Sequence, residues 1–402
     1  MKNQLSLSFL LVTACLLLSS SLNAQVSKTI DVATAGTLPT LITAGEKDQI
    51  THLTVTGNLN GTDIRFIREM AGKNVINEET AGKLSVLDLS QANIVAGGDH
   101  YCIENREDIG LTDSLYTSDN VIGRIMFIGF TGLTQVVLPN SITSIAVSAF
   151  LGCTGLTSLI IPDNVMSIGN AAFAFCTGLT SLSIGNHVTS IGGLTFSGCI
   201  GLTSVRIPNS VTTIQDHAFA SCSGLTSVTI GSGVKSIGRA VFKNCKKLKE
   251  IGVSKENSSY CQVDGVLYSK DKTTLIQCPN ARSGKYAILK GVESIGNDAF
   301  SACDSLTSIT IPKSVTSIGG YAFSQSSIKQ IHCEALTPPS YKKSSRITWD
   351  IEKTDAFLIL DMEKSDAFYA FTKTCKIYVP KGTVAAYKNA DAWKNYKNFI
   401  EE

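Results

Sequence analysis

Residues 156–178, LTSLIIPDNVMSIGNAAFAFCTG, decide the fold, because this pattern returns along the chain every 23 residues. Its phenylalanine marks the period, and a 35-residue insertion delays the last two copies. The column comprises Phe127, Phe150, Phe173, Phe196, Phe219, Phe242, Phe300 and Phe323. A fixed period of this length indicates a solenoid, in which each unit buries its apolar face against its neighbours.

One unit contains two extended segments. Residues 156–161 alternate and are β-branched, which predicts a short strand that Pro162 ends, because proline donates no ladder hydrogen bond. Residues 165–168 are predicted to form a second extended segment. Gly169 and Asn170 then bend the chain, and a short helical or 3₁₀ turn is expected to begin at Ala172 and Phe173. Stacked units would form a parallel sheet and a continuous core.

Three further columns support the repeat. A cysteine follows most of the phenylalanines by three residues, at Cys153, Cys176, Cys199, Cys222, Cys245 and Cys303. A leucine follows by six, at Leu133, Leu156, Leu179, Leu202, Leu225, Leu248 and Leu306. An isoleucine precedes the next phenylalanine, at Ile145, Ile168, Ile191, Ile214, Ile237, Ile295 and Ile318.

The consensus of these columns, C-x-x-L-T-S-[IVL]-x-[IL]-P-x-x-V-T-S-I-G-x-x-A-F, resembles the BspA-type bacterial surface leucine-rich repeats. The resemblance implies a leucine-rich-repeat solenoid of the α/β repeat class, with a parallel β-sheet face and terminal caps. Residues 260–279 also resemble the β-hairpin often inserted in these arrays, with a turn at Lys270 and Asp271. Residues 376–399 resemble the family's closing strand and helix.

Four regions follow. Residues 1–24 resemble a signal peptide, with Lys2, an apolar run and a cut before Gln25, and no later run is long enough to span a membrane. Residues 25–120 are interpreted as an N-terminal cap, in which 61–70 form a helix capped by Asp63. The repeat array covers 121–335, with the hairpin at 255–285. Residues 336–402 hold a long insertion, 340–374, and the C-terminal cap.

Composition and motifs favour binding over catalysis. The net charge is +2, so no electrostatic footprint for nucleic acid is present. The five histidines form no zinc signature, and no nucleophile elbow or phosphate loop occurs, so we expect neither an enzyme nor a cofactor or metal. The pair Asp216 and His217 is expected on an exposed turn. An enzyme with a site in 340–374 is a third hypothesis without support in the sequence.

The cysteine column is expected to be a row of buried free thiols, because cysteine is a small hydrophobe and Phe130 and Ser326 replace it in two units. Outside the column, two disulfides are possible, between Cys261 and Cys278 and between Cys333 and Cys375. Cys15 lies in a lipobox-like sequence, so lipidation there is an alternative to cleavage before Gln25.

If the core columns point inward, alternate strand residues point outward and form a flat, polar face. The candidate binding residues are Ser158, Ser181, Ser183, Ser204, Arg206, Ser227, Thr229, Ser308 and Thr310. The resemblance implies a secreted or cell-surface protein that binds host matrix proteins or other cells. The alternative is a non-enzymatic envelope scaffold with a bacterial partner. A monomer is expected in both cases.

Overall fold

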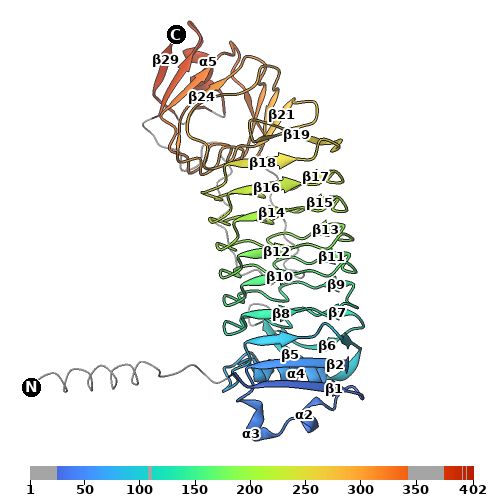
Figure 1. Cartoon of the computed structure of the whole chain (residues 1–402). Helices are drawn as coiled ribbons and strands as arrows, with labels where there is room; N and C mark the ends of the chain where they lie inside the picture. Colours follow the sequence, from blue (N-terminus) through green and yellow to red (C-terminus); the bar gives the residue numbers. More distant parts are fainter. Residues whose placement is uncertain (1–24, 107–110, 343–374, 392, 395) are drawn as a thin grey trace, which may run out of the picture.

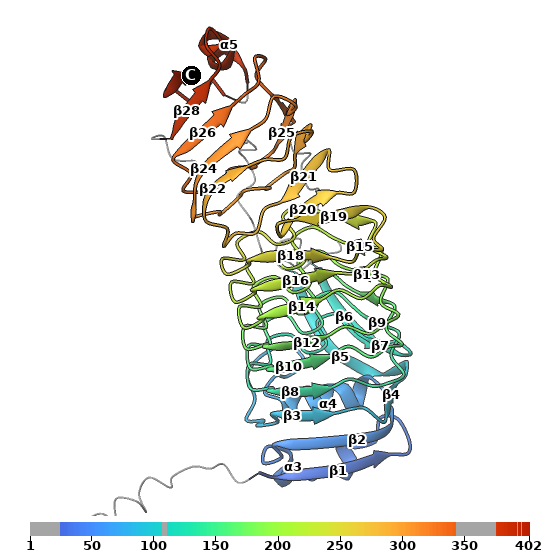
Figure 2. The same cartoon turned by 45° about the horizontal axis from the view of Figure 1, so that its top comes forward.

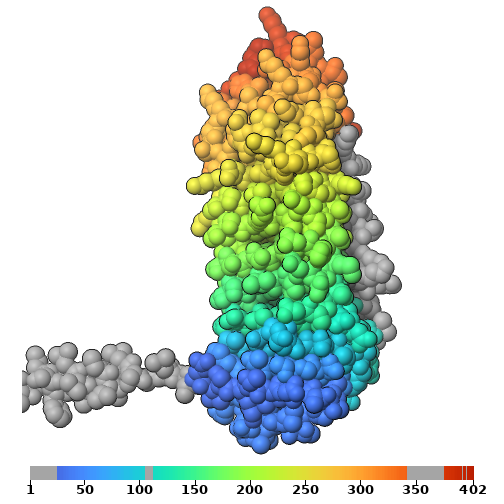
Figure 3. All heavy atoms as spheres, turned by 45° about the vertical axis from the view of Figure 1, so that its right-hand side comes forward, coloured from blue at the N-terminus to red at the C-terminus, as the bar shows by residue number. Residues whose placement is uncertain are grey.

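The chain winds into an elongated coil whose turns stack in sequence order (Figures 1 and 3). The computed structural model describes residues 25–106, 111–342, 375–391, 393–394 and 396–402. Each regular turn has three sides, which we name the long-strand ladder, the short-strand ladder and the Phe side. The predicted solenoid and its 23-residue period are confirmed.

The long-strand ladder is parallel and consists of two sheets, one that ends at β12 and one that begins at β14. Within each sheet, equivalent residues of neighbouring turns lie side by side. Ser158 pairs with Ser181, and Ser204 with Ser227, each one period apart. The strands are β1 (Ser27–Val32), β2 (His52–Leu59), β3 (Val86–Asp88), β8 (Gln135–Val137), β10 (Ser158–Ile160), β12 (Ser181–Ser183), β14 (Ser204–Arg206), β16 (Ser227–Ile230) and β18 (Glu250–Val253). Strand β4 (Ala92–Ile94) also pairs with β2.

The short-strand ladder comes from the second extended segment of each unit, as the sequence predicts. Its isoleucines point into the core, and its serines or threonines point outward. The strands are β7 (Val121–Ile122), β9 (Ser144–Ile145), β11 (Ser167–Ile168), β13 (Ser190–Ile191), β15 (Thr213–Ile214) and β17 (Ser236–Ile237).

The Phe side contains no helix in the described array, so the predicted helical turn is wrong. Instead, the residues two before and two after each column phenylalanine adopt left-handed backbone, with φ between 46° and 73°. The residues before are Ile125, Ser148, Ala171, Leu194, His217, Ala240, Asp298 and Tyr321, and those after are Gly129, Gly152, Phe175, Gly198, Ser221, Asn244, Ala302 and Gln325.

This left-handed backbone turns alternate amides of the Phe side toward the following turn. Ser148, Phe150 and Gly152 donate to the carbonyls of Asn170, Ala172 and Ala174, and the same three bonds recur in other turns. A helical turn would close its hydrogen bonds locally instead. Hydrogen bonds between turns form instead of local helical ones, because stacking pairs the backbone amides and buries the phenylalanine at the same time.

The core is a set of side-chain columns. Phe127 to Phe242 form one stack, with ring centroids 5.0–5.9 Å apart and planes within 22°. The leucine and cysteine columns are fully buried, and the thiols are free, as predicted. From Cys153 to Cys245, each thiol of the column donates to the carbonyl of the phenylalanine one turn earlier; for Cys199 and Phe173 the distance is 3.2 Å. A small side chain with a donor therefore suits this position.

The N-terminal cap holds three helices, α2 (Leu38–Leu41), α3 (Ala44–Lys47) and α4 (Gly61–Met70). Helix α4 is the one predicted from the sequence, and it buries Ile64, Ile67 and Met70. Its N-cap is Asn60, so the prediction of Asp63 as the cap is wrong. Asp63 lies at the third helical position and completes a capping box with Asn60. A hairpin of β5 (Gly97–Arg106) and β6 (Leu111–Thr117) packs on α4.

A three-stranded meander replaces the single predicted hairpin. Strand β20 (Val266–Ser269) pairs antiparallel with both β19 (Tyr260–Val263) and β21 (Thr274–Gln277). One turn lies at Asp264 and Gly265, and the predicted one follows β20. The long-strand ladder stops at β18 and the short-strand ladder stops at β17. One new sheet begins with the meander itself, and another begins at residue 284, after it. We call this break the junction; Figure 2 shows the coil tilting there.

Beyond the junction, a second block closes the molecule. Its long strands are β22 (Gly284–Ala287), β24 (Leu306–Ile311), β26 (Gln330–Cys333), β28 (Lys376–Val379) and β29 (Phe399–Glu401). Its short strands are β23 (Ser294–Ile295), β25 (Ser317–Gly319) and β27 (Ser340–Lys342), which continue from β21. After helix α5 (Val384–Asn389), Trp393 is buried beside Tyr387. The predicted signal peptide and most of the 340–374 insertion lie outside the described residues.

Candidate functional site

The outer face of the long-strand ladder carries most of the predicted binding residues in straight rows. Ser158, Ser181, Ser183, Ser204, Arg206 and Thr229 are exposed, and Ser227 and Thr310 are half-buried. Ser308 is buried, so its predicted exposure is wrong: it pairs between Lys285 and Gln330, whose longer side chains flank it. The structure therefore places seven of the nine residues on the outer face of the long-strand ladder, and Thr310 is accessible on β24 beyond the junction.

An apolar spot interrupts this polar face near its N-terminal end. Ile160, on this face, is 70% exposed. Met166 of the same turn is 55% exposed, but it precedes β11 of the short-strand ladder. Val137 lies beside Ile160 on β8, since Gln135 and Ser158 are paired two residues earlier. Arg206 stands two strands further along the same row as Ile160 and Ser183. Exposed apolar side chains with a nearby arginine are common anchors in protein interfaces.

The long strands beyond the junction carry an aromatic pair that the sequence reasoning missed. His332 on β26 stacks on Tyr378 on β28, with centroids 4.4 Å apart, and His332 Nδ1 lies 2.9 Å from a carboxylate oxygen of Glu402. The two rings are far apart in sequence because a long insertion separates their strands. Aligning Gln330-Ile-His-Cys333 with Lys376-Ile-Tyr-Val379 would have shown that they share a register.

A cluster of charged groups lies on the Phe side at the junction. His217 is only 5% exposed, so the prediction of an exposed Asp216–His217 turn is wrong for the histidine. Burial, with the positive charges of Lys243 and Arg239, lowers the pKa of His217 to about 4. Lys243 Nζ lies 2.8 Å from Asp298 Oδ1, but burial outweighs this pairing and raises the pKa of Asp298. The histidine is therefore neutral at pH 7.

The buried thiols of the cysteine column are unsuited to nucleophilic chemistry. Burial raises the pKa of Cys153 to about 12 and raises the pKa values of Cys176 and Cys199 well above the ordinary value. Thiols that stay protonated are poor nucleophiles. Among the described residues, no group of three or more histidine, cysteine, aspartate or glutamate side chains is placed to hold a metal ion.

Neither expected disulfide is formed. Strand β20 separates Cys261 from Cys278, because Cys261 pairs with Tyr268 while Cys278 follows β21 into the core. Strands β26 and β28 are adjacent, but their register sets Cys333 opposite Val379, four residues away from Cys375. All four are free thiols.

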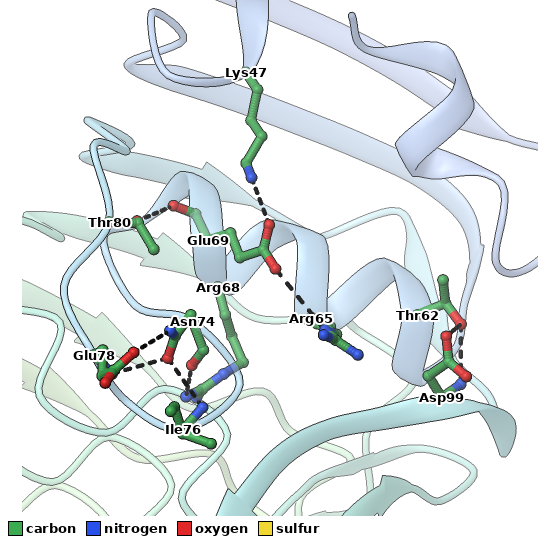
Figure 4. A network of polar contacts seen from close by, with 10 residues as sticks. All are labelled: Lys47, Thr62, Arg65, Arg68, Glu69, Asn74, Ile76, Glu78, Thr80 and Asp99. Carbon is green, nitrogen blue, oxygen red and sulfur yellow. Dashed lines mark hydrogen bonds and ion pairs between the residues drawn. The ribbon is translucent and has the colours of Figure 1, made fainter. Parts of the chain in front are cut away.

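The polar network of the N-terminal cap has a structural role (Figure 4). Arg68 is fully buried, and its guanidinium donates to the carbonyls of Met126 at 2.6 Å and Ile125 at 3.3 Å. Tyr101 donates to the carbonyl of Arg124. In later turns, the carbonyls equivalent to those of Arg124 and Met126 accept Phe-side amides from the preceding turn. The first turn has no preceding turn to supply these amides. Arg68 and Tyr101 therefore cap the open start of the Phe side.

Comparisons with known proteins match this architecture. A family model described as a BspA type leucine rich repeat region matches six copies over residues 120–257 and 277–348. No curated protein matches the chain in sequence. None of the helices in the described parts of the chain has the length and apolar composition needed to cross a membrane.

Several solved structures are similar to the chain. A leucine rich cell surface protein from Faecalibacterium prausnitzii A2-165 is 27% identical, with a TM-score of 0.46 over 73% of this chain and 86% of that one. A leucine-rich repeat protein from Eubacterium ventriosum is 22% identical (TM-score 0.47, 66% and 72%). One from Bacteroides ovatus is 20% identical (TM-score 0.39, 88% and 84%).

Proposed function

Because the chain belongs to the BspA-type leucine-rich repeat proteins, we propose that it is an exported module that binds a protein on host matrix or on another cell. The family supports a protein-interaction or adhesion role in general. The observation that carries the proposal is the exposed face of the long-strand ladder. Its hydroxyl rows, apolar spot and Arg206 lie on one rigid surface that no other part of the described chain covers.

The physical basis is preorganisation. Strands β10 and β16 of this face pair with a neighbour on each side, and β12 and β14 pair on one side, so their side chains lose little freedom when a partner binds. A flat face without a deep cleft suits a protein surface better than a small molecule. The side chains proposed to contact the partner are Ser158, Ile160, Ser181, Ser183, Ser204, Arg206, Ser227 and Thr229, with Thr310 beyond the junction.

Binding of the chain from Gln25 to Glu402 to immobilised matrix proteins, plasma proteins and glycans tests the proposal. The double substitution Ile160→Asp with Arg206→Glu should weaken saturable binding at least tenfold. The control is Ile200→Asp with Lys235→Glu, which makes the same charge changes at exposed positions off this face. Equal loss in both variants would overturn the proposed surface. Binding to none of the immobilised molecules would instead favour the envelope scaffold, whose partner can be sought by cross-linking in cells.

Export belongs to the same proposal. We infer that cleavage before Gln25 releases the mature chain as a monomer, with lipidation of Cys15 as the alternative. The intact mass of the protein recovered from its native cell separates the two, because a lipid on Cys15 adds both acyl mass and the ten residues 15–24. Recovery of an uncleaved chain from the cytoplasm would overturn both.

A further inference from the structure

The hydrogen-bond pattern of the Phe side fails at one place in the described array. In the turn before the junction, His217 and Phe219 donate their amides to the carbonyls of Arg239 and Val241, at 2.9 and 3.0 Å. The equivalent donors of the next turn are the amides of Ala240 and Phe242. Neither has an acceptor among the described residues, because the chain leaves here into the meander instead of adding a turn.

These two amides are buried. Ala240 and Phe242 have almost no exposed surface, and in every comparable turn the equivalent amides point toward the following turn. A buried backbone donor without an acceptor is unfavourable, and native proteins almost always supply a partner. The position therefore calls for an acceptor that this part of the chain does not provide.

A cavity of about 190 Å³ lies on the side of this turn toward which the amides point. Residues 237–242 line one wall, and Leu267, Ile276, Gln277, Gly296 and Asn297 line the other. Its floor is apolar, because Phe242 and Ile237 end the aromatic and isoleucine columns there. A cavity of this size holds a ligand larger than benzene. It occupies the space that the backbone of a regular turn would fill.

The walls offer acceptors as well as donors, and their charges balance. Asp216 lies beside Arg239 and accepts the Arg239 amide at 2.7 Å, and the Lys243–Asp298 ion pair is adjacent. Gln277 and Asn297 add neutral amides. A peptide backbone presents donors and acceptors with no net charge. It therefore matches this lining better than an isolated anion or cation.

We propose that the junction cavity receives a short peptide segment of a partner protein, two of whose carbonyls accept the amides of Ala240 and Phe242. The segment would take the place of the absent turn and cover the ring of Phe242, as strand addition does at a sheet edge. This inference deepens the proposed function and rests on it, because it names where a protein partner's backbone docks.

Amide hydrogen exchange tests the premise without any ligand. In the free protein, the amides of Ala240 and Phe242 should exchange at least tenfold faster than the paired amides of His217 and Phe219. Equal protection at all four positions would overturn the inference, because the donors would then already have partners.

Titration with a capped trialanine peptide, followed by amide chemical shifts, tests the site itself. The expected result is saturable shifts confined to residues 237–242, 276–277 and 296–297. Ile276→Trp fills the cavity and should weaken this binding at least tenfold. Ile200→Trp is the matched control, since Ile200 is exposed and lies outside the cavity. Thermal unfolding of both variants establishes that they remain folded.

Absence of shifts, or equal shifts in the Ile276→Trp variant, would overturn the proposal and leave water as the only occupant. The outcome is separable from that of the proposed function. Loss of adhesion in the Ile160→Asp, Arg206→Glu variant with intact trialanine binding would support both surfaces independently. Trialanine binding by a chain that adheres to nothing would sustain the peptide site and overturn the adhesion proposal.

Discussion

Arg68 shows how one residue can complete a repeat that has no preceding copy. Its guanidinium holds carbonyls that an earlier turn would otherwise engage, and it lies over the Phe130 ring at 5.4 Å. We expect Arg68→Met to keep the packing of the aliphatic part of the side chain but to leave those carbonyls without donors. The free energy of unfolding should fall by about 2–3 kcal/mol. Urea unfolding measures the change.

Arg65→Met is the control for this prediction. Arg65 lies three residues before Arg68 on α4 and is partly exposed. Its Nε lies 3.9 Å from Glu69 Oε1. Exposed pairs of this kind contribute about 0–1 kcal/mol, so the control should change stability little. Equal effects in the two variants would contradict the capping role of Arg68.

His217 predicts a pH dependence of stability. Its folded pKa of about 4 lies below the ordinary histidine pKa of 6.5, so the unfolded chain binds a proton first as the pH falls. Stability from this group is therefore complete above about pH 6.5 and declines by up to about 3 kcal/mol as the pH falls to 4. His217→Gln should flatten that part of the pH profile, measured by urea unfolding at fixed pH. An unchanged slope between pH 6.5 and 4 would show that other groups cause the decline.

At the scale of elements, Asn280 joins the two blocks across the meander. Its Oδ1 accepts the Cys245 amide at 2.9 Å, and its Nδ2 donates to the Ser301 carbonyl at 2.6 Å. Both contacts are buried, so Asn280→Ala should lower the free energy of unfolding by about 2–3 kcal/mol. Asn209→Ala is the control, because Asn209 makes one similar bond at the exposed surface. A smaller loss at Asn280 than at Asn209 would contradict this role.

The columns explain why the elements themselves are so regular. A strand of three residues is too short to be stable alone, yet each one pairs with at least one neighbouring turn and places an aliphatic side chain in a shared core. The left-handed residues of the Phe side are tolerated because each turn gains three hydrogen bonds to the next. The cost of left-handed backbone is thus outweighed by the hydrogen bonds between turns.

At the scale of the whole molecule, the junction divides the core into two clusters. One runs from Val32 to Leu267, and the other from Val266 to Trp393. Because no ladder crosses the junction in the described chain, we expect the two blocks to unfold as separate cooperative units. Native-state hydrogen exchange at increasing urea should give β8–β18 and β22–β29 different opening free energies.

The regular array supplies the comparison for that prediction. Strands β14 and β16 pair directly within one sheet, so their amides should open together under every condition. Asn280→Ala should widen the difference between the two blocks and leave β14 and β16 coupled. A single opening free energy throughout the molecule would show that the two blocks unfold cooperatively across the meander, as neighbouring regular turns do.

The sequence by itself determined the period, the core columns, the two ladders, the buried thiols and helix α4, because each rests on local or repeated spacing. It could not determine the backbone of the Phe side, where hydrogen bonds between turns replace a helical turn. The sequence also did not predict that β20 separates Cys261 from Cys278. It predicted neither the burial of His217 and Ser308 nor the stacking of His332 on Tyr378. These depend on register between segments far apart in the chain. The 35-residue insertion showed in the sequence that the repeat is interrupted, but only the tertiary structure shows that two buried amides and a cavity lie next to each other at that place.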